Sequence, residues 1–173
     1  MSFLNIEIKA KFLKTSEVDN YIHSLNFTFE GNYKQTDTYF NVNFGRLKLR
    51  QQSPGSDCLI FYDRENKILP KESKYQIVNI GDAGSAVQLL SAAMGVLVIV
   101  KKKREFWRWK NVRVFFDQVE NLGSFIEFEA VCKSEEDIIP SRENVNYLMT
   151  ALNVKEEDLV ATSYSDLIMS IKT

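Results

Sequence analysis

Charged side chains recur at every second residue in several β-type runs of this chain. Three runs show the pattern most clearly: NIEIKAK with Glu7, Lys9 and Lys11, GRLKLR with Arg46, Lys48 and Arg50, and FIEFEAV with Glu127 and Glu129. Because successive side chains of a strand point to opposite faces, each run would have one charged face and one apolar face. Cations dominate some runs and carboxylates others, which suits a site that binds both a polyanion and a metal ion.

Size and composition predict one domain over residues 1–173, because 173 residues with 45% hydrophobic and 26% charged residues can bury a sizeable core. The net charge of -1 offers no broad basic field for nucleic acid. The longest apolar stretch, AAMGVLVIV, is too short to cross a bilayer. No signal-peptide pattern is seen, and Cys58 and Cys132 are expected to be free thiols. We therefore expect a cytoplasmic protein with no nucleic-acid or membrane partner.

Eight runs have the alternation or the β-branched and aromatic content of strands: 5–13, 33–42, 45–53, 57–64, 72–80, 96–104, 106–117 and 124–133. Turn residues between several of them predict antiparallel hairpins, and Glu105 would mark a tight turn. Helices are predicted at 17–25, 83–94, 142–152 and 155–170, so the C-terminal helices span about 141–170. The predicted class is α+β, with a closed eight-stranded antiparallel barrel, or tunnel, over about 5–133 and helices packed outside it.

A barrel with its charged faces inward would point Leu47, Leu49, Ile126 and Phe128 outward, where helices must cover them. Closure would also leave no unpaired strand edge. Inward charges lose solvation, so the interior must be wet, paired or filled by a ligand. The apolar outer faces would also support a homodimer, although the predicted helices are sufficient to cover them.

The inward faces define a candidate site. Its expected substrate-binding cations are Lys9, Arg46, Lys48, Arg50, Arg64, Lys102, Arg104 and Arg113. Its expected carboxylates are Glu7, Asp117, Glu127 and Glu129. Guanidinium and ammonium groups suit phosphate oxygens, and clustered carboxylates suit Mg²⁺ or Mn²⁺ that also bridges to substrate phosphates. Lys101 and Lys103 fall on the opposite face, and Asp37 is expected to orient a cation rather than to bind metal.

The ordered set of motifs resembles the CYTH superfamily, also called triphosphate tunnel metalloenzymes. The resemblance covers about residues 5–133 and is carried by NIEIKAK, QTDTYF followed by GRLKLR, LIFYDR, VKKKR and RVFFDQVENLGSFIEFEAV. It implies an eight-stranded antiparallel tunnel, a divalent metal and triphosphate-containing substrates. Known members include class IV adenylate cyclases, thiamine triphosphatases and inorganic triphosphatases.

The resemblance assigns roles to individual residues. Glu7 and Lys9 match the second acid and the lysine of the family's ExExK signature, which makes them the expected catalytic residues, whereas Asn5 stands in place of the first Glu. The metal ligands implied are Glu7, Asp117, Glu127 and Glu129. Because Asn5 replaces a carboxylate, one metal ligand or one water-positioning base would be missing. This argues against a second metal ion and against turnover.

A tyrosine matching Tyr39 is thought to act in thiamine triphosphatases beside a lysine of the fourth strand, where this chain has Arg64. Arginine cannot serve as a general base, which argues against thiamine triphosphate. The expected function is metal-dependent hydrolysis of a phosphoanhydride bond of inorganic triphosphate or a nucleoside triphosphate. Two alternatives stay open: a class IV adenylate cyclase, which converts ATP to cyclic AMP and pyrophosphate, and a non-catalytic polyphosphate- or nucleotide-binding module.

Overall fold

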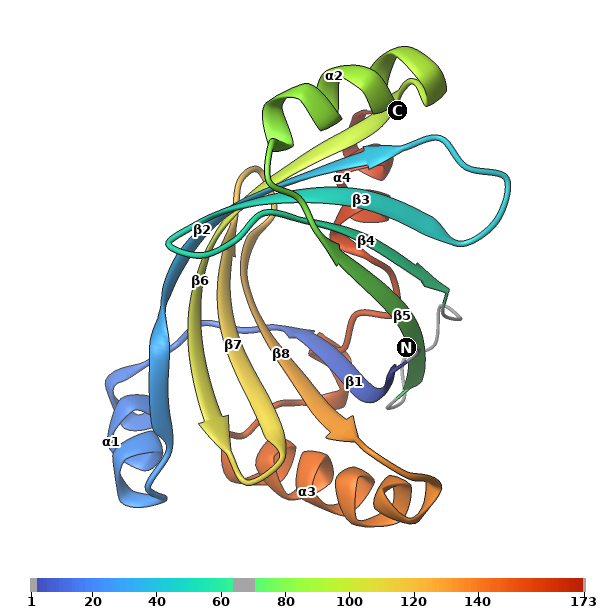
Figure 1. Ribbon diagram of the computed structural model, residues 1–173. Coiled ribbons are helices and arrows are strands. Elements are labelled where there is room, and N and C mark those ends of the chain that lie inside the picture. Colours follow the sequence, from blue (N-terminus) through green and yellow to red (C-terminus); the bar gives the residue numbers. More distant parts are fainter. Residues whose placement is uncertain (1–2, 64–70, 173) are drawn as a thin grey trace.

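The computed structural model describes residues 3–63 and 71–172, within which eight strands and four α-helices form the α+β fold of Figure 1. The strands are β1 (Phe3–Lys11), β2 (Thr28–Phe40), β3 (Arg46–Ser53), β4 (Cys58–Asp63), β5 (Lys71–Asn79), β6 (Val96–Trp109), β7 (Val112–Val119) and β8 (Gly123–Cys132). The α-helices are α1 (Ser16–Ser24), α2 (Ala83–Met94), α3 (Ile138–Ala151) and α4 (Tyr164–Lys172). The predicted class and the eight antiparallel strands are confirmed.

The strands pair in the order β1-β5-β4-β3-β2-β6-β7-β8, and every pair is antiparallel. This order returns to its first member, since β1 pairs with both β5 and β8. Neighbours such as β2–β3 and β7–β8 are joined by short connections, as the turn residues predict. The curled sheet therefore has an inner face that can enclose a site and an outer face that helices must cover.

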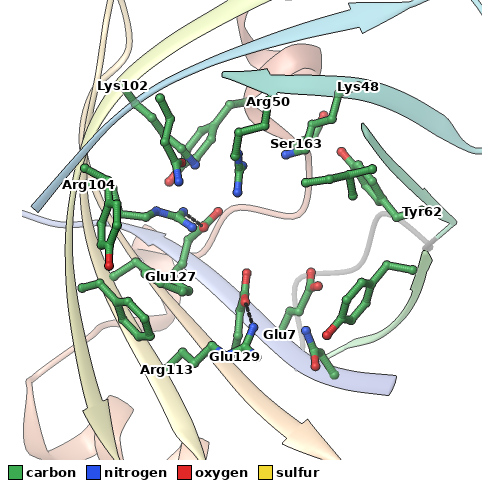
Figure 2. A pocket seen from close by; sticks show the side chains of 18 of the residues that line it. Glu7, Lys48, Arg50, Tyr62, Lys102, Arg104, Arg113, Glu127, Glu129 and Ser163 are labelled. Carbon is green, nitrogen blue, oxygen red and sulfur yellow. Dashed lines mark hydrogen bonds and ion pairs between the residues drawn. The ribbon is translucent and has the colours of Figure 1, made fainter. Parts of the chain in front are cut away.

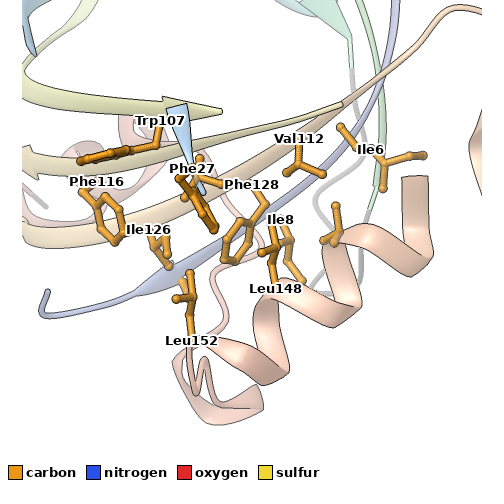
Figure 3. Close-up of a cluster of buried hydrophobic side chains, with 14 of the residues drawn as sticks. Ile6, Ile8, Phe27, Trp107, Val112, Phe116, Ile126, Phe128, Leu148 and Leu152 are labelled. Carbon is orange, nitrogen blue, oxygen red and sulfur yellow. The ribbon is translucent and has the colours of Figure 1, made fainter. Parts of the chain in front are cut away.

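The largest apolar core lies between the outer face of the sheet and α3 (Figure 3). Ile8 of β1 and Ile126 and Phe128 of β8 are buried there with Val145 and Leu148 of α3. Each such side chain contributes about 1.5–3 kcal/mol when it leaves water. The prediction that Ile126 and Phe128 face outward beneath a helix is confirmed.

A smaller core lies where α2 crosses the outer face of β2 and β3 (Figure 1). Phe40 and Leu49 are buried there against Ala83, and Leu47 packs beside them. Asp82 caps α2 by accepting a hydrogen bond from the backbone N–H of Ser85 at 3.0 Å. The apolar face of the basic strand β3 is thus used for helix packing, which leaves its charged face for the interior.

The predicted turn at Glu105 is wrong, because β6 continues to Trp109 and Glu105 pairs with Asn32 and Phe116 inside the sheet. Alternation of inner and outer side chains continues without a break through this run, and the chain reverses after it at Lys110, whose φ is +51°. Strand β2 also begins earlier than predicted, at Thr28, and includes a register shift between Phe29 and Gly31. Both changes lengthen the wall formed by β2 and β6.

The helix predicted at 155–170 is also wrong in its first half. A short 3₁₀ helix at Glu156–Asp158 is followed by an extended segment in which Leu159 bridges to Ala10 and the N–H of Val160 donates to the carbonyl of Lys9 at 2.8 Å. Pairing with β1 replaces helical hydrogen bonds here, and α4 begins only at Tyr164. Helix α3 begins at Ile138, three residues before the predicted start of the C-terminal helices.

Both cysteines are free, as predicted: Cys132 is buried and Cys58 is half-buried. Within residues 3–63 and 71–172, the helices are all too short or too polar to cross a membrane.

Candidate functional site

A cavity of about 380 Å³ lies on the inner face of the sheet (Figure 2). The predicted site residues that line it are Glu7, Lys9, Lys48, Arg50, Lys102, Arg104, Arg113, Glu127 and Glu129. Arg46 and Asp117 are not among the lining residues, and Arg64 lies outside the described residues. Side chains from β1, β3, β6, β7 and β8 thus meet in one cavity, as their alternation predicts.

The carboxylates lie on the part of the wall that β1 and β8 form. Glu7 is directly opposite Glu129 in the β1–β8 register, and Lys9 is directly opposite Glu127. Lys9 Nζ lies 3.1 Å from Glu127, whereas Arg113 is 3.8 Å from Glu129. Burial and the neighbouring charge of Glu7 raise the pKa of Glu129, although Arg104 and Arg113 oppose this. The crowding of like charges favours binding of a cation here.

Two cations of β3, Lys48 and Arg50, are held by Asp37 of β2, in agreement with the expectation that Asp37 orients a cation. The Asp37 carboxylate accepts hydrogen bonds from Lys48 at 2.8 Å and from two nitrogens of Arg50, each at 2.7 Å. Burial alone would raise the pKa of Asp37, but the charges of Arg50 and Lys48 outweigh it and hold the pKa well below its usual range. This carboxylate therefore stays ionised and orients both cations toward the cavity (Figure 2).

A second carboxylate, Asp117 of β7, plays the same part behind the cations of β6. It accepts two hydrogen bonds from Arg104 at 2.6 Å, one from Lys102 at 3.3 Å and one from the Tyr164 hydroxyl at 3.0 Å. Arg104 also pairs with Glu127. Burial and the charge of Arg104 lower the pKa of Lys102 to about 7, although Asp117 opposes this. Asp117 thus orients Lys102 and Arg104, whose binding to phosphate stays a prediction, as does the role of Asp117 as a metal ligand.

Helix α4 closes one end of the cavity, which sequence reasoning missed. Ser163 and Tyr164 line the cavity, and the Lys9 ammonium lies 3.8 Å from the centre of the Tyr164 ring. Arg46 pairs with Asp166 of α4 at 2.9 Å, which explains its absence from the lining. A signal was present in the sequence: Ser163 and Asp166 form a reciprocal cap, with N–H to side-chain distances of 3.1 Å in both directions.

The carboxylates fit a metal that keeps part of its water. Within the described ranges, His, Cys, Asp and Glu side chains form no group of three or more that could hold an ion alone. Mg²⁺ is commonly bound through one or two carboxylates plus waters and substrate phosphates, and the pair Glu7 and Glu129 meets that lower requirement. Asn5 lies two residues from Glu7, is 3% exposed, and its Oδ1 has no hydrogen-bond partner among the described atoms. A neutral oxygen thus stands where another carboxylate would strengthen metal binding.

Comparison with known proteins agrees with the fold. The sequence model of the CYTH domain family matches residues 4–164. A Methanocaldococcus jannaschii protein named "Putative adenylate cyclase" is 24% identical over 172 residues, covering 95% of this chain and 98% of its own. A solved Pyrococcus horikoshii protein has a TM-score of 0.81 at 23% identity, with 94% of this chain and 98% of that chain covered. A solved Vibrio parahaemolyticus structure, described as "a putative adenylate cyclase", has a TM-score of 0.80 at 19% identity, with 96% of this chain and 98% of that chain covered.

Proposed function

The chain belongs to the CYTH domain family, and from this premise we propose that it cleaves a phosphoanhydride bond of a triphosphate-containing small molecule with Mg²⁺ or Mn²⁺. One observation carries the proposal: inward cations and inward carboxylates line the same cavity. The cations are Lys48 and Arg50 of β3 and Lys102 and Arg104 of β6, and the carboxylates are Glu7 of β1 and Glu127 and Glu129 of β8. A triphosphate needs the first set to neutralise its oxygens, and its metal needs the second.

Binding would begin with the cations. Asp37 and Asp117 already hold the guanidinium groups of Arg50 and Arg104 in place through Nε and one terminal nitrogen of each, so the other terminal nitrogen can meet phosphate oxygens with little reorganisation. Burial and the charges of Arg104 and Arg50 all lower the pKa of Lys102, and a bound phosphate would favour the protonated form of this lysine. Catalysis by these groups is electrostatic, because they offset the charge that moves as the phosphoanhydride bond breaks.

The carboxylate wall, formed by Glu7 of β1 and Glu127 and Glu129 of β8, would bind the metal and provide the acid–base groups. Glu7 and Glu129, with Glu127 beside them, are the residues that would hold the ion, which supplies Lewis-acid stabilisation of phosphate charge when bound. The Lys9 ammonium is held by Glu127 at 3.1 Å and by the carbonyl of Thr162 at 3.3 Å, so its position in the cavity is fixed from two sides. In hydrolysis, Glu7 would orient the attacking water.

Hydrolysis of the terminal phosphoanhydride bond is our first candidate. Adenylate cyclisation is the second, favoured by the names of the Methanocaldococcus and Vibrio relatives. In that reaction the ribose 3′-hydroxyl attacks the α-phosphorus and pyrophosphate leaves. The same cations and metal serve both reactions, and the difference lies in which phosphorus is attacked.

A metal-by-substrate screen tests the proposal. Purified protein is incubated with inorganic triphosphate, ATP or thiamine triphosphate and with Mg²⁺ or Mn²⁺, and phosphate, pyrophosphate and cyclic AMP are resolved. Glu129→Gln should abolish turnover, whereas Glu120→Gln, on an exposed residue outside the cavity, should not. Phosphate release supports the hydrolase, and cyclic AMP with pyrophosphate selects the cyclase. Tight triphosphate binding without any product overturns the catalytic proposal in favour of a binding module.

A further inference from the structure

The cavity opens in one direction along β6. The inward side chains of this strand become progressively more exposed: Lys102 is 3% exposed, Phe106 is half-buried and Arg108 is 45% exposed. Tyr164 and α4 close the opposite end. A triphosphate held by Lys102 and Arg104 would therefore extend any organic group past Phe106 toward Arg108.

Three aromatic side chains line the cavity along this exit: Tyr33 of β2, Phe106 of β6 and Phe115 of β7, which we call the aromatic strip. Phe106 pairs with Phe115 in the β6–β7 register, and their ring centres are 4.8 Å apart. The Tyr33 ring lies 6.4 Å from that of Phe106. The strip thus places three neighbouring rings, tilted by 40° and 46° to one another, along the exit of the cavity.

The backbone opposite Phe106 is built to accept this arrangement. Gly31 is the register partner of Phe106 on β2 and has φ of +142°, a conformation that other residues rarely adopt. A Cβ at Gly31 would approach the Tyr33 ring to 3.3 Å, so the absence of a side chain leaves room for that ring. Glycine at this position therefore leaves space for the Tyr33 side chain beside Phe106.

The strip also has cations beside it. The Arg104 guanidinium lies 3.9 Å from the centre of the Phe115 ring, and that of Arg108 lies 5.6 Å from the centre of Phe106. Arg104 therefore lies over one ring of the strip, so a phosphate bound to Arg104 would be next to the rings. Inorganic triphosphate has no group that could stack on an aromatic surface. A nucleobase can stack on one, and this holds for every base.

We infer that the aromatic strip is the subsite for the base of a nucleoside triphosphate, with Phe106 as the principal stacking surface. This inference rests on the proposed function, because the triphosphate must be held by the inner cations for the base to reach the strip. It narrows the substrate class from any triphosphate to one that carries a planar heterocycle. The ribose would span the step between Arg104 and Phe106, which is one inward position along β6.

The test compares the affinities of ATP and inorganic triphosphate, measured by calorimetry in EDTA so that turnover does not interfere. Phe106→Leu keeps an apolar side chain but removes the ring, and it should weaken ATP binding by about five- to hundredfold while leaving inorganic triphosphate unchanged. Phe106→Tyr should restore ATP binding. Phe44→Ala, which removes an exposed ring outside the cavity, is the matched control and should change neither affinity.

The two ligands separate the two proposals. Equal affinities of Phe106→Leu and the wild type for ATP, or an equal loss for both ligands, would overturn the base subsite while inorganic triphosphate binding still supports the proposed function. If the wild type binds neither ligand in EDTA and still binds neither when the titration is repeated with Mg²⁺, the proposed function fails and the subsite fails with it. Circular dichroism of each variant excludes unfolding as the cause of a loss.

Discussion

The ammonium group of Lys9 on β1 lies 3.8 Å from the centre of the Tyr164 ring at the start of α4. The same tyrosine donates its hydroxyl hydrogen bond to Asp117 on β7 at 3.0 Å. Burial and the Asp117 charge keep the pKa of Tyr164 well above its usual range, so it stays a neutral donor. Tyr164 of the C-terminal helix therefore contacts both Lys9 on β1 and Asp117, the carboxylate that orients Lys102 and Arg104.

Tyr164 is expected to serve both stability and site geometry. Tyr164→Phe keeps the ring beneath Lys9 but leaves Asp117 without one donor, and should lower the free energy of unfolding by about 1 kcal/mol. Tyr164→Ala also opens a cavity and should cost about 3–5 kcal/mol. Urea unfolding followed by circular dichroism measures both values. Equal costs for the two variants would contradict a role for the ring.

Asp37 should make the stability of the protein depend on acid pH. Its folded-state pKa lies well below the usual value, so the unfolded chain binds the proton more readily. The stabilisation is therefore complete above the ordinary Asp pKa of about 3.9 and is lost as the pH falls through the lower folded pKa. Asp37→Asn should cost about 3–5 kcal/mol at pH 7, because Lys48 and Arg50 lose their buried partner.

The measurement is urea unfolding of the wild type and Asp37→Asn from pH 7 down to pH 3. The difference between them should shrink over the acid end of that range. The exposed Asp63→Asn is the control and should show a small, pH-independent difference. A constant gap between wild type and Asp37→Asn would mean that the ion pairs do not set the acid stability.

Adjacent lysines of β6 should differ sharply in their effect on triphosphate binding. Lys102 lines the cavity, whereas Lys103 is exposed on the opposite face of the strand. Lys102→Met should weaken inorganic triphosphate binding by at least about tenfold, since a charged hydrogen bond is worth about 1.5–3 kcal/mol. Lys103→Met should leave the affinity unchanged. Calorimetry at low ionic strength measures both, and similar losses would indicate attraction by the general surface charge instead.

Asn5→Glu should raise the affinity for the metal, because it adds the carboxylate that the ExExK resemblance implies at this position. Asn5 is buried beside Glu7 on the inner face, so an added charge would act at short range and low screening. The metal concentration for half-maximal activity should fall by roughly tenfold, and Asn5→Gln should not change it. Titration with Mn²⁺ measures this. An unchanged requirement would place the metal away from Asn5.

Inward and outward positions could be predicted from the sequence because the side-chain period of a strand is local. The alternation in NIEIKAK, GRLKLR and FIEFEAV correctly separates Lys48 from Leu49 and Glu127 from Phe128. The same rule placed Lys102 inside and Lys103 outside. It misplaced a boundary at Glu105, where a single charged residue resembles a turn but lies within a continuous strand.

The turn residues predict hairpin neighbours such as β2 and β3, but only the tertiary structure decided the register of each pair and the long-range pairings, and therefore which charges meet. Asp37 reaches Lys48 and Arg50 because β2 and β3 pair in one register, and Asp117 sits behind Arg104 because β6 and β7 do. The Ser163–Asp166 cap was visible in the sequence, but the position of this helix start beside the cavity depends on the pairing of Val160 with Lys9. Such contacts join residues far apart in the chain, so local periodicity determines the faces of each strand and the long-range pairing determines the site.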